Sequence, residues 1–186
     1  GRGHEIACHG YHHNRFPELS ANAIRADLEM ALDLFERYHG YRLRGFRAPY
    51  LEINEEVYKA LRKYEFLYSS SRMGSGKPQD RPLGIIEYPI SVDDWMVLIK
   101  ENGGVGELTA EMRNGAADGA CFLLHPCRVG QQKYAGALDS FFEIGLEYRF
   151  PTLSEACEGS GGIALTGDIG ELGLWEVARR CLPGAH

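Results

Sequence analysis

The prediction of the fold starts from His9-Gly10-Tyr11-His12-His13, which follows a strand-like run beginning near residue 4. Residues 4–9 are predicted to form a short buried strand, so the imidazoles come where that strand ends. If the chain turns helical there, the four-residue spacing puts His9 and His13 on one face. Two neutral imidazoles arranged in this way are two of the ligands that a divalent metal ion takes. The alternative interpretation is a histidine-rich surface loop.

The composition is that of one globular domain with a sizeable core. The chain has 186 residues, of which 44% are hydrophobic and 25% are charged. The net charge of -6 argues against a nucleic-acid partner, and the lack of an apolar run of about 18 residues argues against a membrane span. No signal peptide is visible, although Gly1-Arg2-Gly3 looks like a cut point. For the oligomeric state, a symmetric homo-oligomer is the default expectation.

Several histidines and cysteines are expected to be structural. His4 and His12 are assigned this role because not every imidazole of such a cluster can face a metal ion. Cys8 and Cys121 lie in apolar runs and are predicted to be small core residues. The five cysteines are an odd number without close metal-type spacing, which favours a reducing, cytoplasmic location.

Strand-like and helical segments alternate along the chain. The predicted helices are 20–38, a second that begins after Asn54, 106–116, 131–147, and a short one after the capping box at Thr152. Ser20 and Gly40 are predicted to cap the first of them, and Leu146 is expected on the inward face of 131–147. The predicted strands are 4–9, 43–47, 66–69, 85–90 and 120–124, the last of them buried on both faces. Residues 71–84 are predicted to be a mobile loop. This alternation predicts an α/β fold with functional residues at the carboxyl ends of the strands.

Three further polar motifs follow where predicted strands end. They are Arg47-Ala48-Pro49-Tyr50, Asp93-Asp94-Trp95 and Leu124-His125-Pro126. Together with residues 9–13 they resemble, in the same order, the motifs of the polysaccharide deacetylase family, the NodB-homology carbohydrate esterases. The first segment is similar to the family's metal-binding His-[Ser/Thr]-x-x-His, with Gly10 in place of the hydroxyl residue. The residues of these motifs are most similar to those of the branch that contains peptidoglycan-type deacetylases and the allantoin and cyclic-imide hydrolases.

The resemblance implies a distorted, incomplete (β/α) barrel and a role for each motif residue. His9 and His13 would bind the metal ion, and His125 would be the general acid, a role that suits a group titrating near neutrality. Asp94 would form a hydrogen bond with this acid, and Arg47 would orient the catalytic aspartate. The implied substrate-contacting walls are Pro49, Tyr50 and Trp95. Each of these residues also has a plain alternative, as a core side chain or a surface ion-pair partner.

The family's first motif, Thr-Phe-Asp-Asp-Gly, does not precede residues 9–13 here. A divergent version appears at 163–170, Ile-Ala-Leu-Thr-Gly-Asp-Ile-Gly, after the glycine-rich joint 159–162. We therefore expect one domain over 1–186, with a main body at 1–158 and a circularly permuted first strand and helix at 159–186. Asp168 would then be the general base or the third metal ligand. The alternative is an unrelated tail.

The expected function is metal-dependent removal of N-acetyl groups from an amino sugar or polysaccharide. Hydrolysis of cyclic imides or ureides is a variant within the same branch. A degenerate relative that binds glycans without turnover is the competing class, because only one carboxylate stands where the family has two. The cofactor would be one divalent ion, with zinc first and nickel, cobalt, manganese or iron as alternatives. The expected partner is a small-molecule or oligosaccharide substrate, with no nucleic acid and no membrane.

Overall fold

The computed structural model describes residues 4–75, 78–80 and 83–157. Asp168 and the segment 159–186 therefore lie outside the described residues. The α-helices are α1 (Ala21–His39), α2 (Glu55–Lys63), α3 (Val105–Asp118), α4 (Pro126–Val129), α5 (Ala135–Glu147) and α6 (Leu153–Cys157). The strands are β1 (Gly45–Phe46), β2 (Tyr68–Ser69), β3 (Gln79–Asp80), β4 (Ile86–Glu87), β5 (Val92–Asp93) and β6 (Phe122–Leu123). Shorter turns are η1 (Phe16–Glu18), η2 (Pro49–Leu51), η3 (Met96–Lys100) and η4 (Gln132–Tyr134).

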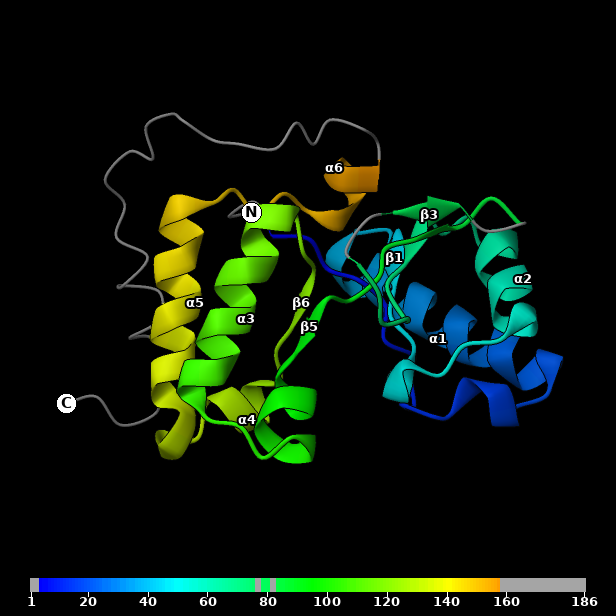
Figure 1. Ribbon diagram of the computed structural model, residues 1–186. Helices are drawn as coiled ribbons and strands as arrows, with labels where there is room; N and C mark the ends of the chain where they lie inside the picture. The colour runs from blue at the N-terminus through cyan, green and yellow to red at the C-terminus, as the bar shows by residue number, and fades with distance from the viewer. Residues whose placement is uncertain (1–3, 76–77, 81–82, 158–186) are drawn as a thin grey trace.

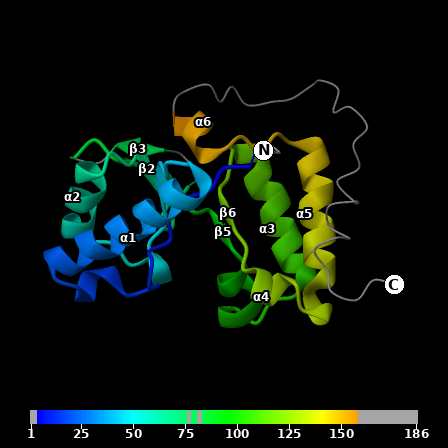
Figure 2. The ribbon, with the colours of Figure 1, turned by 180° about the vertical axis from the view of Figure 1, so that it is seen from behind.

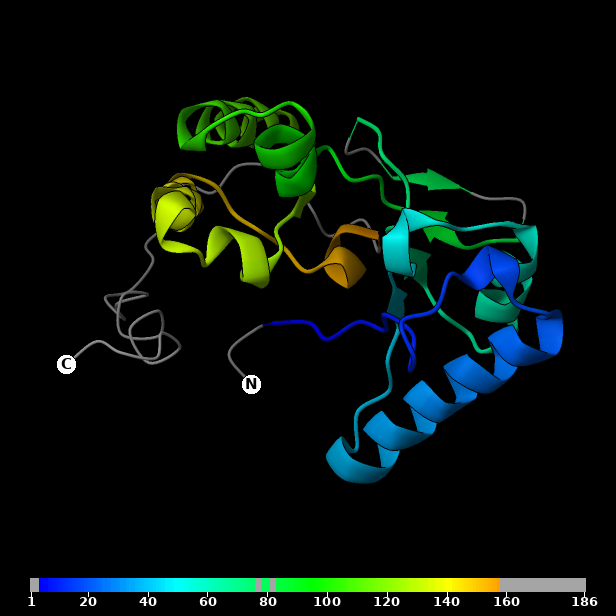
Figure 3. The same ribbon diagram turned by 90° about the horizontal axis from the view of Figure 1, so that it is seen from below.

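These elements form two halves that lie side by side, seen from opposite faces in Figures 1 and 2. In the first half, β1, β2 and β4 are parallel neighbours, and β3 adds antiparallel to β4. In the second half, β5 pairs in parallel with β6. The helices lie outside the strands, with α1 and α2 flanking the first half and α3 and α5 the second (Figure 3). Parallel strands covered by outer helices, in two separate sheets, make the distorted and incomplete (β/α) barrel that we expected.

The predicted first strand is present only as a single bridge. Cys8 pairs in parallel with Phe46, and its amide donates to the Gly45 carbonyl at 2.8 Å. The amide of Arg47 in turn donates to the Cys8 carbonyl at 2.9 Å. This bridge is enough to align the end of the segment with the end of β1, so His9 and Arg47 leave the sheet next to each other.

The ends of the helices agree with the predicted caps. The hydroxyl of Ser20 accepts from the Ala23 amide at 3.3 Å, and α1 ends at Gly40 in the left-handed conformation with φ 58°. The side chain of Asn54 accepts from the Val57 amide at 3.1 Å and begins α2. Thr152 and Glu155 exchange the two hydrogen bonds of a capping box before α6.

Some expectations about burial and loops are wrong. β6 is only half-buried, because within the described residues β5 is its one strand partner and aromatic side chains such as Phe141 cover one face. Leu146 was expected to face inward but is 60% exposed, since α5 buries the face that carries Ala137 and Ile144. The predicted loop 71–84 contains β3 and a parallel bridge between Met73 and Ile90.

Each half has its own hydrophobic core. The first is built around Phe16, Leu28 and Phe46, and the second around Leu108, Met112 and Ile144. Both Cys8 and Cys121 are buried, as predicted for small core residues. Among the described helices, none is both long and apolar enough to cross a bilayer. The two cores leave the ends of the strands free to line a cavity between the halves.

Candidate active site

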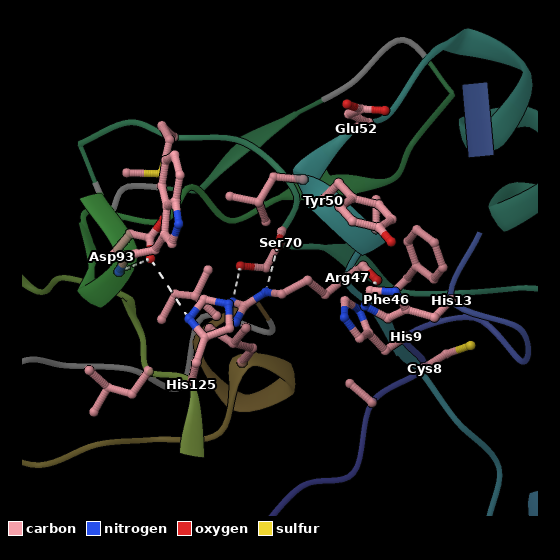
Figure 4. A pocket seen from close by; sticks show the side chains of 18 of the residues that line it. Cys8, His9, His13, Phe46, Arg47, Tyr50, Glu52, Ser70, Asp93 and His125 are labelled. Carbon is pink, nitrogen blue, oxygen red and sulfur yellow. Dashed lines mark hydrogen bonds and ion pairs between the residues drawn. The ribbon is translucent and has the colours of Figure 1, made fainter. Parts of the chain in front are cut away.

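A cavity of about 990 Å³ opens where the strand ends of the two halves meet (Figure 4). The first half contributes His9, His13 and Arg47 to its lining, and the second contributes Asp93, Trp95 and His125. Its volume is at the upper end of the range of about 300–1,000 Å³ that ligand pockets occupy. The cavity therefore brings residues from all four sequence motifs into one place.

His9 and His13 meet through a turn and not through a helix, so the conditional expectation of a helical segment is wrong. The chain reverses at Gly10, whose φ is 77°, and His13 itself has φ 55°. The ring centroids lie 4.9 Å apart with their planes at 76°. The two imidazoles are thus neighbours at the rim of the cavity, as two ligands of one metal ion must be.

The tautomer of His9 follows from its hydrogen bond. Its Nδ1 lies 2.7 Å from the carbonyl oxygen of Arg47, and a carbonyl only accepts, so Nδ1 carries the proton. Partial burial lowers the pKa of His9, and the neighbouring positive charges of His13 and Arg47 lower it further. A neutral ring with a bonded Nδ1 keeps Nε2 available, which is the usual arrangement of a metal-binding histidine.

His12 has the structural role that we expected. Its Nδ1 lies 3.0 Å from Oδ2 of Asp27, a carboxylate that is 3% exposed on α1. The cavity lining includes His9 and His13 but not His12.

Arg47 points its guanidinium toward Ser70. Nε donates to the Ser70 carbonyl at 2.8 Å, and Nη2 donates to the Ser70 hydroxyl at 2.7 Å. Among the described residues, no carboxylate accepts a hydrogen bond from Arg47, so the predicted contact with Asp168 concerns a residue outside them. Ser70 was missed by the sequence analysis, because a single serine after a strand carries no recognisable signal.

Asp94 and His125 form a hydrogen-bonded pair. Oδ1 of Asp94 lies 2.5 Å from Nδ1 of His125, and Oδ2 accepts from the His125 amide at 2.8 Å. Asp94 is fully buried, while His125 faces the cavity. Arg128, one helical turn further along, places Nη1 3.3 Å from Oδ1 of Asp94. This arginine was also missed, although its position three residues after His125 could have indicated it.

Asp93, Asp94 and His125 bring ligand-type atoms within 4.8 Å of one another. A metal ion fits this cluster poorly, because the Asp94 carboxylate is already occupied by His125 and by the cationic Arg128. Asp93 lies 4.0 Å from Nδ1 of His125, and its Oδ1 accepts from the Trp95 amide at 2.9 Å. Burial raises the pKa of Asp93, which disfavours the ionised form that a metal ion needs. His9 and His13 fit a metal ion better.

Of the three predicted wall residues, two line the cavity. Tyr50 is 54% exposed, with the Arg15 guanidinium 4.2 Å above its ring and the His13 ring 5.0 Å away. Trp95 belongs to the second half, also lines the cavity and is 41% exposed. Pro49 is buried at the start of η2 and is not part of the lining. Its contribution is to the backbone turn that presents Tyr50, whose φ is 60°.

Comparisons with known proteins agree with this architecture. Residues 1–69 match the family model described as polysaccharide deacetylase. A peptidoglycan deacetylase-like protein, FGM2 of Gibberella zeae, is 32% identical over 99 residues, which cover 50% of this chain and 29% of that protein. The chain spans less than a third of the length of the curated relatives that it matches.

Solved structures extend the likeness to nearly the whole chain. A candidate polysaccharide deacetylase from Mycobacterium smegmatis superposes with a TM-score of 0.68 and 26% identity, over 89% of this chain and 68% of that one. The structure of Puue allantoinase gives the same TM-score of 0.68 at 17% identity, over 84% of this chain and 58% of that one. The second likeness concerns the fold alone.

Proposed function

We propose that the chain is a member of the polysaccharide deacetylase family, whose model residues 1–69 match, and that it hydrolyses the N-acetyl amide of an amino sugar or polysaccharide. The observation that carries the proposal is the Asp94–His125 pair, which faces the His9–His13 pair across one cavity. Amide hydrolysis needs an acid for the departing nitrogen and a site that polarises the carbonyl group. The two pairs supply side chains for these two tasks.

His9 and His13 are the proposed metal ligands of this site, with Asp168 as the third ligand or as the general base. A divalent ion held there, zinc first among the candidates, would polarise the amide carbonyl and make a bound water more acidic. The Arg47 carbonyl supports this assignment, because it keeps His9 in the tautomer whose Nε2 is available. The geometry at Asp168 is outside the described residues, so its role is a proposal from the sequence.

His125 is the proposed general acid. Water adds its oxygen to the acetyl carbon, the carbon–nitrogen bond breaks, and Nε2 of His125 gives its proton to the departing amine. Asp94 supports this role because it orients the ring through Nδ1 and so leaves Nε2 for the substrate. The proton lost by water passes to the general base, for which Asp168 is the candidate.

The cavity walls suit a sugar ring. Tyr50 and Trp95 are large, partly exposed aromatic side chains that line the cavity from different halves, and they offer apolar faces to the apolar face of a sugar. An oligosaccharide is therefore the proposed substrate class. Hydrolysis of a cyclic imide or ureide is the alternative outcome of the same test.

Two further proposals concern the chain as a whole. We place a circularly permuted first strand and helix at 159–186, on the basis of the motif-like residues 163–170 alone. We also propose a cytoplasmic location, on the basis of the odd number of cysteines without close metal-type spacing.

The decisive experiment measures metal content together with turnover. The purified chain should bind about one divalent ion, and a variant carrying His9→Ala and His13→Ala together should lose it. Loaded with zinc, the parent should release acetate from chito-oligosaccharides and leave allantoin and cyclic imides intact. Ring opening of an imide without acetate release would shift the assignment to the alternative. No bound metal and no turnover would overturn the proposal and leave a glycan-binding relative.

The same experiment tests Asp168. Asp168→Asn should lower metal content or abolish turnover, while Asp139→Asn, at an exposed position of α5, should do neither. An unchanged Asp168→Asn variant would remove both this residue and the permuted strand from the mechanism.

A further inference from the structure

Asp27 holds the turn that carries the two imidazoles. Its carboxylate projects from the second turn of α1 and is 3% exposed. Oδ1 accepts from the Tyr11 amide at 2.7 Å, and Oδ2 accepts from the His12 amide at 3.2 Å and lies 3.0 Å from His12 Nδ1. Two of these three contacts are to backbone groups between His9 and His13.

The turn packs closely against this carboxylate. Gly10 has φ 77°, and a Cβ atom built there would lie 3.2 Å from Oδ1 of Asp27 and 3.0 Å from the Phe16 ring. The absence of a side chain at Gly10 therefore lets the chain close over the carboxylate. His13 follows with φ 55°, a conformation that non-glycine residues adopt only when their surroundings hold them.

We propose that Asp27 is a positioning residue that sets the separation of the His9 and His13 rings and thereby the affinity of the site for its metal ion. The inference rests on the proposed function, in which these two imidazoles bind the metal. Asp27 itself is not among the residues that line the cavity. Its effect on the site therefore passes through the backbone amides of Tyr11 and His12.

A purely structural role is the alternative, since a buried carboxylate with three donors also stabilises the fold. The two roles differ in what they predict for a variant that stays folded. Asp27→Asn keeps the shape of the side chain but puts an NH2 group where one of the acceptor oxygens was. A structural role lowers stability alone, whereas a positioning role also weakens metal binding by the molecules that remain folded.

The test measures zinc affinity by competition with a chromophoric chelator, at a temperature where every variant is folded. Asp27→Asn should weaken zinc binding by about 10- to 100-fold, the range observed when the residues that support metal ligands are changed. Asp33→Asn, on the exposed face of the same helix, should bind zinc like the parent. His12→Ala should also stay close to the parent, because it removes the ring contact and leaves both backbone amides bonded to Asp27.

The second readout uses the metal-free protein. In the parent, the Tyr11 and His12 amides should exchange slowly with solvent and the His9 and His13 rings should show mutual nuclear Overhauser effects. In Asp27→Asn, these two amides should exchange faster and the Overhauser effects between the rings should weaken, while the other amides of α1 still exchange slowly. Unchanged zinc affinity in Asp27→Asn, or unchanged ring contacts, would overturn the inference.

This design separates the inference from the proposed function. If the parent binds no zinc, the proposed metal site fails, and the ring contacts of the metal-free protein alone decide whether Asp27 positions the two histidines. If the parent binds zinc and Asp27→Asn binds it equally well, the metal site stands and the role of Asp27 fails.

Discussion

The carboxylate of Asp94 contacts His125 at two points, the ring Nδ1 at 2.5 Å and the backbone amide at 2.8 Å. One buried anion therefore fixes both the position of the residue and the direction of its ring. Because Nδ1 is occupied, only Nε2 is left to exchange a proton with a molecule in the cavity. This relationship makes the proposed acid testable without changing the metal ligands.

His125→Ala should lower kcat for acetate release by about 100- to 10,000-fold, the usual contribution of a general acid or base. KM and zinc content should stay near those of the parent, because His9 and His13 are untouched. Asp94→Asn should reduce kcat in the same direction, since an amide has only one acceptor oxygen and cannot accept from both the ring Nδ1 and the backbone amide of His125. Steady-state kinetics with metal analysis checks this, and a large loss of zinc in His125→Ala would contradict the assignment.

Asp93 predicts an unusual dependence of stability on pH. Burial raises its pKa in the folded protein above the ordinary value of 3.8. The folded state therefore holds its proton to higher pH than the unfolded state, and this group's contribution to the free energy of unfolding falls as pH rises through the window above 3.8. Asp93→Asn, which keeps an oxygen for the Trp95 amide, should thus gain stability relative to the parent at pH 7 and lose that advantage at pH 3.

Urea unfolding of the parent and Asp93→Asn at several pH values measures this difference. Asp139→Asn serves as a surface carboxylate control and should show no such trend. If Asp93→Asn were less stable than the parent at pH 7 and more stable only in acid, the pKa of Asp93 would not be raised in the folded protein.

Cys8 should be far less reactive than Cys127. Burial raises the pKa of the Cys8 thiol to about 11, so almost no thiolate is present at pH 8, although the residue borders the cavity. Cys127 is exposed on α4. Brief treatment with iodoacetamide followed by peptide mass spectrometry should label Cys127 first, and preferential labelling of Cys8 would show that the cavity opens more widely than the structure indicates.

Glu87 supports the segment that presents Arg47 and Tyr50. This fully buried carboxylate accepts from the Tyr58 hydroxyl and the Ser71 amide, each at 2.7 Å, and the Ser71 hydroxyl in turn accepts from the Ala48 amide at 2.9 Å. Glu87→Ala leaves two buried donors without an acceptor and should lower the free energy of unfolding by about 2 kcal/mol or more.

The matched variant for Glu87 is Tyr58→Phe, which removes one donor and leaves the Ser71 amide bonded. It should cost less stability than Glu87→Ala, and urea titration of the two variants beside the parent gives the comparison. Equal stability of Glu87→Ala and the parent would show that the network does not hold the segment.

The sequence predicted best what is decided locally. Ser20 and Asn54 cap their helices with their own side chains, so a few neighbouring residues are enough to locate each start. The same holds for the placement of the motifs at strand ends, which follows from the alternation of strands and helices. Local patterns therefore predicted the fold class. The motifs predicted six residues of the cavity lining, which are His9, His13, Arg47, Tyr50, Trp95 and His125.

Contacts between distant residues could not be predicted in this way. Asp27 lies on a helix, and nothing in its own sequence surroundings shows that its carboxylate binds the amides of Tyr11 and His12. The predicted conformation of residues 9–13 was wrong for the same reason, because the carboxylate that contacts this turn belongs to Asp27 on α1. Pro49 was expected in the wall, yet the backbone turn at η2 buries it and exposes Tyr50 instead.

The separation of the two hydrophobic cores has a consequence for how activity should be lost. His9 and His13 are anchored to one core and the Asp94–His125 pair to the other, so the site exists only while the halves stay docked. Mild denaturant should therefore abolish turnover at concentrations where each half still keeps its helices, because docking is lost before either core melts. In this protein, turnover would report the loss of contact between the halves at a lower denaturant concentration than helical content does.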